Sequence, residues 1–271
     1  MKKKDYIQAN RKSWNEVAAV HHEAKKKIKE KFFVSGYACL DELVTRHLES
    51  VGLKGKRVAQ LCCNDGLETL SIKNLGASSC VGFDISDHAI EQAKQLAADT
   101  GITCDFVQTD ICEIPERYDH QFDLIYISSG SLIWFPDLQE FFQVVNRLLA
   151  RNGKVLIYDI HPLLFMLDEK DRDNPLQLKY SYFIEEPRVY DDGLDYVSNT
   201  AYESAPHYVF DPTLSQVISA VIANKLQLEK FEEFPHDISA LFPHLAEQPV
   251  NVPASYILIA EKQGDFTKSF L

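Results

Sequence analysis

The sequence predicts an α/β protein whose core is a doubly wound, mostly parallel sheet of seven strands. Two observations support this prediction. Between residues 56 and 160, short runs rich in β-branched and aromatic residues alternate with helical patterns, as they do in parallel sheets with crossover helices. At 271 residues, 45% of them hydrophobic, the chain is long enough to form one large α/β domain or two small ones.

Five strands are expected in the alternating region and two more toward the end of the chain. The first five are the runs KRVAQLC, CVGFDIS, CDFVQTD, FDLIYIS and KVLIYDI. The last two are LQLEKFEEF (226–234) and SYILIAEKQ (255–263), which are candidates for an antiparallel pair.

The helical patterns have apolar stripes and recognisable ends. DLQEFFQVVNRLLARNG carries apolar residues at helical spacing and is expected to stop at the Asn-Gly pair 152–153. DHAIEQAKQLAADTG follows Ser86 or Asp87 as its cap. A later helix is expected to begin with Asp211 as N-cap and proline in the first turn. Each strand–helix unit can therefore cover one face of the sheet.

Two segments do not fit the alternating pattern. Residues 1–50 are expected to form helices before the first strand, and residues 161–210 form an insertion after the fifth. In the insertion, the sequence DDG (191–193) is a turn signal and predicts one hairpin or two. The core domain then comprises residues 51–160 and 211–271. Half of the twelve tyrosines lie in the insertion, namely Tyr180, Tyr182, Tyr190, Tyr196, Tyr202 and Tyr208.

The composition of the chain indicates which binding partners and which cellular location to expect. The chain has 28 Lys and Arg against 40 Asp and Glu, and its formal charge of −12 disfavours nucleic acids and anionic membranes. The N-terminus lacks the apolar run of a signal peptide, and transmembrane-length apolar stretches are absent, so a cytoplasmic location is expected. The six cysteines form no C-x-x-C pair, which indicates small buried side chains in a reducing compartment.

Residues that follow the strands are the candidates for a ligand site, because doubly wound sheets bind ligands beyond the carboxyl ends of their strands. The stretch Cys62-Cys63-Asn64-Asp65-Gly66 must turn sharply after the first strand, and glycine and asparagine tolerate a left-handed conformation there. Asp84 ends the second strand, eighteen residues after Gly66, near the spacing at which an acid binds ribose hydroxyls. Asp110 ends the third strand, where it can accept from an adenine amino group beside the Ile111 backbone. Each acid taken singly could instead be a helix cap.

Taken in order, VAQLCCNDG, VGFDIS, FVQTDI, FDLIYISSGSLIW and GKVLIYDIHP resemble the successive motifs of the class I S-adenosylmethionine-dependent methyltransferases. The resemblance covers residues 56–160 closely and implies the Rossmann-like methyltransferase fold, with S-adenosylmethionine as cofactor. The usual first motif is an acid followed by glycines at three alternate positions. In this chain Gln60, Cys62 and Asn64 replace the acid and two glycines, and Gly66 remains.

The resemblance also implies residue roles. Asp84, followed by Ile85, would hold the ribose, Asp110 with Ile111 the adenine, and the turn at 62–66, including Cys63, the methionine portion. Ser128 with Ser129 would lie beside the reactive sulfonium. The N-terminal helices of the family often form a lid; Arg11 would then meet the cofactor carboxylate and Trp14 would pack on the ligand. The alternatives are a solvated charge for Arg11 and a packed helix-face aromatic for Trp14.

Three histidines are candidates for a general base, should the methyl acceptor need to lose a proton: His161, His207 and His236. Their spacing matches no local metal motif, so no metal is expected. Methyl transfer from a sulfonium is an in-line displacement, in which the protein mainly aligns the acceptor in a water-poor pocket.

The sequence thus predicts a methyltransferase acting on a small molecule. The run SSGSLIW lacks the Asn/Asp-Pro-Pro-aromatic motif of enzymes that methylate amino groups in nucleic acids. Two other functions stay open: a nicotinamide-dependent oxidoreductase, and a catalytically silent relative that binds the cofactor. The tyrosine-rich insertion suits either a partly apolar acceptor or the interface of a homodimer.

Overall fold

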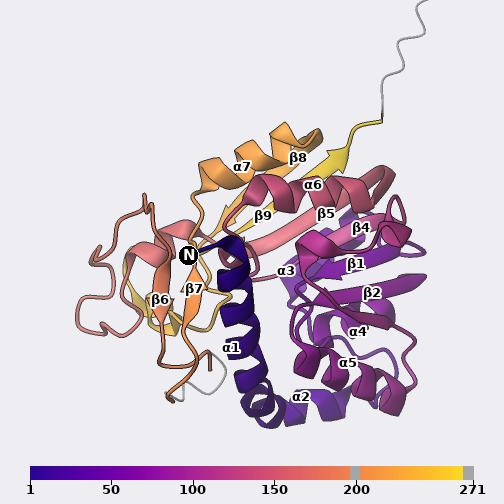
Figure 1. Ribbon diagram of the computed structural model, residues 1–271, viewed down its shortest axis with the longest axis horizontal. Helices are drawn as coiled ribbons and strands as arrows, with labels where there is room; N and C mark the ends of the chain where they lie inside the picture. Colours follow the sequence, from indigo (N-terminus) through magenta and orange to yellow (C-terminus); the bar gives the residue numbers. More distant parts are fainter. Residues whose placement is uncertain (196–201, 265–271) are drawn as a thin grey trace, which may run out of the picture.

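The computed structural model describes residues 1–195 and 202–264, and Figure 1 shows a twisted central sheet covered by helices. Seven strands follow one another across the sheet in the order β3-β2-β1-β4-β5-β9-β8. Strands β1 to β5 pair in parallel, and β9 pairs antiparallel with both β5 and β8. The predicted seven-stranded, mostly parallel sheet is confirmed, including its antiparallel last pair. The strands are β1 Arg57–Leu61, β2 Ser79–Asp84, β3 Asp105–Gln108, β4 Phe122–Ile127, β5 Leu149–Ile160, β8 Leu226–Phe234 and β9 Ser255–Lys262.

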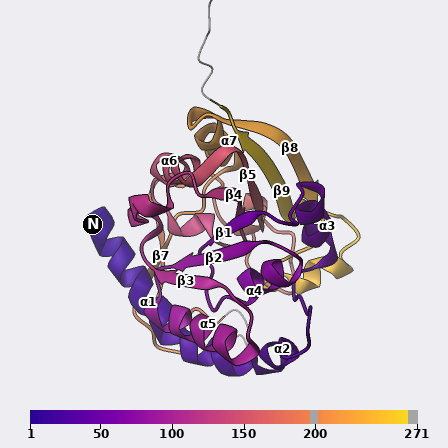
Figure 2. The same ribbon diagram turned by 90° about the vertical axis from the view of Figure 1, so that its right-hand side faces the viewer.

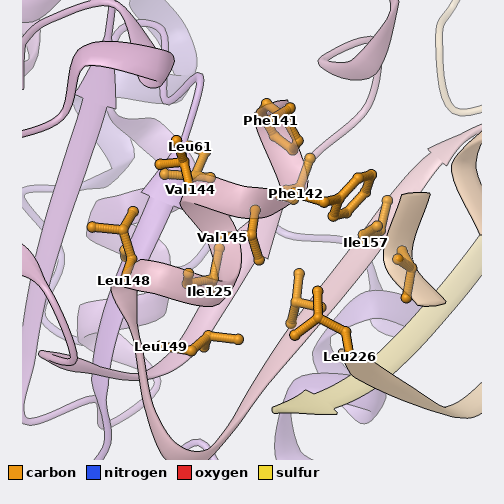
Figure 3. Packing of buried hydrophobic residues seen from close by; sticks show 14 of the residues in the cluster. Leu61, Ile125, Phe141, Phe142, Val144, Val145, Leu148, Leu149, Ile157 and Leu226 are labelled. Carbon is orange, nitrogen blue, oxygen red and sulfur yellow. The ribbon is translucent and has the colours of Figure 1, made fainter. Parts of the chain in front are cut away.

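Helices cover both faces of this sheet. On one face, α6 (Leu138–Leu148) and α7 (Leu214–Ala223) lie side by side over the largest hydrophobic cluster, part of which Figure 3 shows around Phe142 and Ile125. On the other face, α3 (Glu42–Ser50), α4 (Leu67–Asn74) and α5 (Asp87–Thr100) pack over two further clusters. Figure 2 shows α3 and α6 on opposite sides of the sheet.

Two predicted helix boundaries were wrong. Helix α6 ends at Leu148, because Leu149 already takes an extended conformation and pairs with Phe122 of β4 at the start of β5. Helix α7 is capped by Thr213, whose hydroxyl accepts from the Gln216 backbone N–H. Asp211, the predicted cap, instead pairs with Arg188 of the insertion at 2.6 Å. The Ser86 cap of α5 is present, since its hydroxyl accepts from the Ala89 N–H.

The N-terminal segment is helical, as expected. Helix α1 (Lys3–Ala24) lies between the main sheet and a small sheet of the insertion, where it contacts α5 and β7 (Figure 1), and the short α2 (Lys26–Lys31) follows it. Among the described residues, the helices are too short or too polar to cross a bilayer.

Within its described residues, the insertion contains one antiparallel pair, β6 (Arg188–Tyr190) with β7 (His207–Val209). The DDG turn signal lies in the connection between them. In the run LDYVSN that follows this signal, Leu194 and Asp195 are not in a strand, and residues 196–199 lie outside the described residues. Short 3-10 helices complete the fold at 111–113, 116–118, 132–134, 162–166 and 243–247.

Candidate active site

The strand order reverses between β1 and β4, which makes the carboxyl ends of β1 and its neighbours the expected ligand site. Leu61, the last residue of β1, pairs with Phe83 of β2 and with Ile127 of β4. The next residues along these strands are the turn at 62–66, Asp84 and Ser128. The sheet register therefore brings together three of the predicted site elements.

The turn after β1 has a left-handed backbone at three alternate positions. The φ angles of Cys62, Asn64 and Gly66 are 58°, 48° and 76°. A left-handed conformation costs a non-glycine residue about 1–2 kcal/mol, although asparagine tolerates it better than most. Cys62 and Asn64 therefore have the backbone conformation that glycine favours.

Gly66 is required for a second reason, which is space. A Cβ atom at this position would lie 2.6 Å from Cε1 of Phe106 and 2.8 Å from Cβ of Ala93. Gly66 is also the N-cap of α4, so the helix follows the turn without an intervening residue. The close approach fixes the start of α4 against β3 and α5.

The two vicinal cysteines face different surroundings. Cys63 is buried in the cluster beneath the turn, and its N–H donates to the Phe83 carbonyl at 3.0 Å, so its side chain packs in the core. Burial raises the pKa of the Cys62 thiol well above its usual value, and the nearby carboxylates of Asp84 and Asp110 raise it further. The Cys62 side chain packs against the hydrophobic cluster on the other face of the sheet.

The left-handed conformation of Cys62 leads to a testable expectation. We expect Cys62→Gly to unfold with a free energy at least equal to that of the wild type, because glycine adopts this φ without strain. Cys62→Val should lose about 1–2 kcal/mol relative to Cys62→Gly, since a β-branched residue is strongly disfavoured there. Urea denaturation measures both; equal stability of the valine and glycine variants would contradict the conformation.

Asp84 is buried at the end of β2 and accepts two backbone hydrogen bonds. Its Oδ2 accepts from the Asn64 N–H at 2.8 Å, and its Oδ1 accepts from the Ser86 N–H at 2.9 Å. Burial raises the pKa of this carboxyl, and the two N–H donors partly offset the rise. A carboxylate has about four acceptor sites, so Asp84 can still accept from two hydroxyls of a ligand.

Asp110 follows β3 and is half-buried. Its Oδ1 accepts from the Cys112 N–H at 2.9 Å, so Asp110 caps the short helix at 111–113. This is the helix-cap role expected from the sequence as the alternative to ligand binding. Its remaining acceptor sites also permit a ligand contact. Ile111 is buried beside it, and the Ile85 carbonyl accepts from the Gln108 side chain at 3.1 Å.

A buried polar network links the ends of β1 and β4 with the start of α4. The Gln60 amide donates to Glu68 Oε2 at 2.6 Å and to Ser128 Oγ at 3.3 Å, and its Oε1 accepts from Thr69 at 2.6 Å. The Tyr126 hydroxyl donates to Glu68 Oε1 at 3.4 Å. Glu68 is not among the site residues predicted from the sequence. The only feature of the sequence that marks it is its place as an acidic residue in the first turn of α4. Ser129, unlike Ser128, is exposed.

The N-terminal helices contact the site through charged residues that the sequence did not single out. Asp65 of the turn is buried and pairs with Lys25 at 3.4 Å and with Lys29 at 3.1 Å. Although burial alone would raise the pKa of Asp65, the two lysines hold it below its usual value. Lys25 and Lys29 thus fasten the α1–α2 junction to the turn.

Arg11 and Trp14 lie on α1, in the N-terminal helical segment. In the structure, each of them contacts a residue outside the turn at 62–66. Arg11 donates to Asp87 at the start of α5, at 3.0 Å from its Nη2, in an open groove of about 440 Å³ between α1 and α5. The Trp14 ring meets the Trp134 ring edge-on, at 5.3 Å between centroids. The proposed ligand contacts of both residues stay predictions.

Asp159, near the end of β5, holds the loop that follows β4. It is 3% exposed and accepts from the N–H groups of Gly130 at 2.5 Å and Ile160 at 2.8 Å. Burial raises its pKa to about 7, against a usual value of 3.8, and the backbone donors partly counter the rise. The loop that carries Ser128 therefore depends on a carboxyl that titrates near neutrality.

A pH dependence of stability follows from Asp159. A pKa raised in the folded state adds stability that is complete below pH 4 and is lost as the pH rises toward 7. The unfolding free energy of the wild type, relative to Asp159→Asn, should therefore fall by up to about 4 kcal/mol between pH 4 and pH 7.5. Urea denaturation across this range measures the difference; a constant difference would contradict the raised pKa.

The three candidate histidines lie in different environments. His207 of β7 is 3% exposed, and its Nδ1 lies 3.5 Å from the Ser13 hydroxyl; burial lowers its pKa to about 4. His161 uses both ring nitrogens, with Leu163 N–H at 3.1 Å and Glu233 at 2.9 Å.

His236 is exposed and bonds the Tyr158 hydroxyl at 2.8 Å. Among the three, His207 alone contacts the aromatic rings near the end of β4, since Trp134 lies 6.0 Å from it and Tyr190 stacks on it at 5.5 Å.

Comparison with known proteins finds similarity to methyltransferases. Residues 58–153 match the family model described as a methyltransferase domain. An uncharacterized protein of Haemophilus influenzae is 24% identical over 206 residues, which cover 73% of this chain and 74% of that protein.

Two shorter matches involve named enzymes. A ubiquinone biosynthesis O-methyltransferase of Citrobacter koseri is 30% identical over 106 residues, or 39% of this chain and 43% of that enzyme. An rRNA N(6)-adenosine-methyltransferase of Danio rerio is 31% identical over 87 residues, covering 32% of this chain and 42% of that enzyme. The chain therefore matches less than half the length of these enzymes.

Among solved structures, a putative S-adenosylmethionine-dependent methyltransferase from Listeria monocytogenes superposes with a TM-score of 0.61 at 18% identity. The alignment covers 82% of this chain and all of that one, which shows a shared fold. Residues 58–153 of the chain therefore form a methyltransferase domain, and the sheet order is the fold of the class I S-adenosylmethionine-dependent methyltransferases.

Proposed function

We propose that the protein transfers a methyl group from S-adenosylmethionine to a small-molecule acceptor. The observation that carries this proposal is Asp84, which ends the strand beside β1 and keeps two acceptor sites next to a left-handed turn. The antiparallel β9 also argues against the nicotinamide alternative, whose usual dinucleotide fold is a parallel sheet in the order 3-2-1-4-5-6.

The residues at the strand ends fit this cofactor by their chemistry. Asp84 would accept from the ribose hydroxyls, and Asp110 from the adenine amino group. The turn, with its three left-handed residues, would lie along the methionine portion, and Ser128 near the sulfonium. When bound, S-adenosylmethionine supplies an electrophilic methyl group, so the chain's own task is to bind, orient and exclude water.

The acceptor would approach along an aromatic wall made by three elements. Trp14 of α1, Trp134 of the 3-10 helix 132–134 and His207 of β7 are in successive ring contact. This surface is apolar, and the depressed pKa keeps His207 uncharged at neutral pH, which suits a small, partly apolar acceptor. A neutral imidazole orients an acceptor hydroxyl or amine by accepting its hydrogen bond; with a pKa of about 4 it is a weak base.

Isothermal titration with S-adenosylhomocysteine tests cofactor binding, and release of S-adenosylhomocysteine in the presence of a broad panel of small acceptors tests transfer. Wild-type protein should bind and should turn over with at least one acceptor. A lack of binding would refute the proposal. Binding without turnover, either on this panel or on an rRNA acceptor tested beside it, would favour a silent relative. The absence of glycine at positions 62 and 64 of the turn motivates this alternative.

A further inference from the structure

The amino-acid end of the proposed cofactor carries an ammonium group, so its site needs a carboxylate whose charge is still available. Three other buried carboxylates near the strand ends already have partners or a proposed role. Asp65 pairs with two lysines, Asp159 accepts two backbone N–H bonds, and Asp84 also accepts two and is assigned to the ribose. The first-motif acid of the family is replaced by Gln60, which is 1% exposed and neutral.

Glu68 differs from these carboxylates in its partners. Its oxygens accept from neutral groups: the Gln60 amide at 2.6 Å, the Tyr126 hydroxyl at 3.4 Å, and Ser128. In the part of the chain that the structure describes, Glu68 forms no ion pair within 4 Å, although Lys25 contributes a weaker favourable field. Burial raises the pKa of Glu68, as expected for a carboxylate that lacks a cationic partner.

The position of Glu68 matches the place of the missing acid. The Gln60 side-chain amide donates one hydrogen bond to the Glu68 carboxylate and another to the Ser128 hydroxyl. The Glu68 carboxylate therefore lies beside the ends of β1 and β4. Ser128 is the residue assigned to the neighbourhood of the sulfonium. A cation between the turn and Ser128 would therefore meet Glu68.

We propose that Glu68 is the carboxylate that binds the ammonium group of the cofactor, and that α4 supplies the acid which β1 has lost. This inference rests on the proposed function. It also explains why a glutamine is tolerated at position 60: the Gln60 amide orients the acid instead of providing it.

The test compares two ligands that differ in the group concerned. S-adenosylhomocysteine has the amino-acid end, whereas 5′-methylthioadenosine keeps the adenosine and thioether but lacks it. By isothermal titration, Glu68→Gln should bind S-adenosylhomocysteine at least tenfold more weakly than the wild type and 5′-methylthioadenosine with unchanged affinity. The exchange variant Gln60→Glu/Glu68→Gln should recover most of the loss. Glu91→Gln, an exposed change on α5, is the matched control and should bind both ligands normally.

The outcomes separate this inference from the proposed function. If wild type binds neither ligand, the proposed function fails with it. If wild type binds S-adenosylhomocysteine and Glu68→Gln binds it equally well, or loses both ligands alike, the role of Glu68 is refuted while the function stands. A selective loss that the exchange variant does not recover would refute the equivalence of positions 60 and 68.

Discussion

Replacing Asp84 with asparagine is expected to weaken S-adenosylhomocysteine binding by about 100-fold or more. The amide keeps the shape of the side chain but loses the charge and half of its acceptor sites, of which the Asn64 and Ser86 N–H groups need two. Charge-assisted hydrogen bonds are about twice as strong as neutral ones, and losing two of them corresponds to roughly 3 kcal/mol. Isothermal titration measures the change.

Asp87→Asn is the matched control for this experiment. Asp87 lies three residues along, is partly exposed and pairs with Arg11, so its loss should change affinity by less than about threefold. Thermal denaturation of both variants checks that the fold is retained. An affinity of Asp84→Asn within threefold of the wild type would remove Asp84 from the site and with it the main support for the proposed function.

Gly66→Ala is expected to destabilise the protein by about 3 kcal/mol or more. The φ of 76° costs alanine about 1–2 kcal/mol, and overlap with Phe106 and Ala93 adds about 1–3 kcal/mol of overpacking. Because α4 begins at this residue, the displaced turn should also bind S-adenosylhomocysteine more weakly. Urea denaturation measures the stability.

Gly101→Ala separates the two causes. Gly101 caps α5 with a similar φ of 69°, but a Cβ there would meet nothing within 4 Å, so only the conformational cost of about 1–2 kcal/mol applies. Adding Phe106→Leu to Gly66→Ala should restore part of the lost stability by making room. Equal losses for Gly66→Ala and Gly101→Ala would contradict the steric account.

The sheet was predictable because its signal is local. Alternating strand and helix patterns fix the strands, and a parallel sheet brings the strand ends to one edge, so Asp84 and the turn at 62–66 could be placed together. Helix boundaries were less predictable. Leu149 suits a helix by its apolar spacing, and only its pairing with Phe122 moves it into β5. Likewise, both Asp211 and Thr213 are good N-cap residues for α7. Thr213 is the cap in the structure, and Asp211 instead pairs with Arg188 of the insertion.

The parts of the site that sequence reasoning missed depend on contacts between distant segments. In the sequence, Lys25 and Lys29 look like surface charges on a basic helix. In the structure they form ion pairs with Asp65, which lies about 40 residues later in the chain. Asp159 reads as the end of a strand, and its role appears only when the loop after β4 folds against it. The three histidines looked equivalent, whereas ring contacts with Trp134 and Tyr190 distinguish His207.

The left-handed turn has a consequence for how such proteins are found. A search pattern that demands glycine at positions 62 and 64 rejects this chain, although its backbone turns there with positive φ at both residues. At these two positions the chain adopts, with cysteine and asparagine, the left-handed torsion angles that glycine adopts without strain. Divergent members of the family are therefore better sought by backbone geometry after the first strand, together with an acid at the end of the second, than by counting glycines.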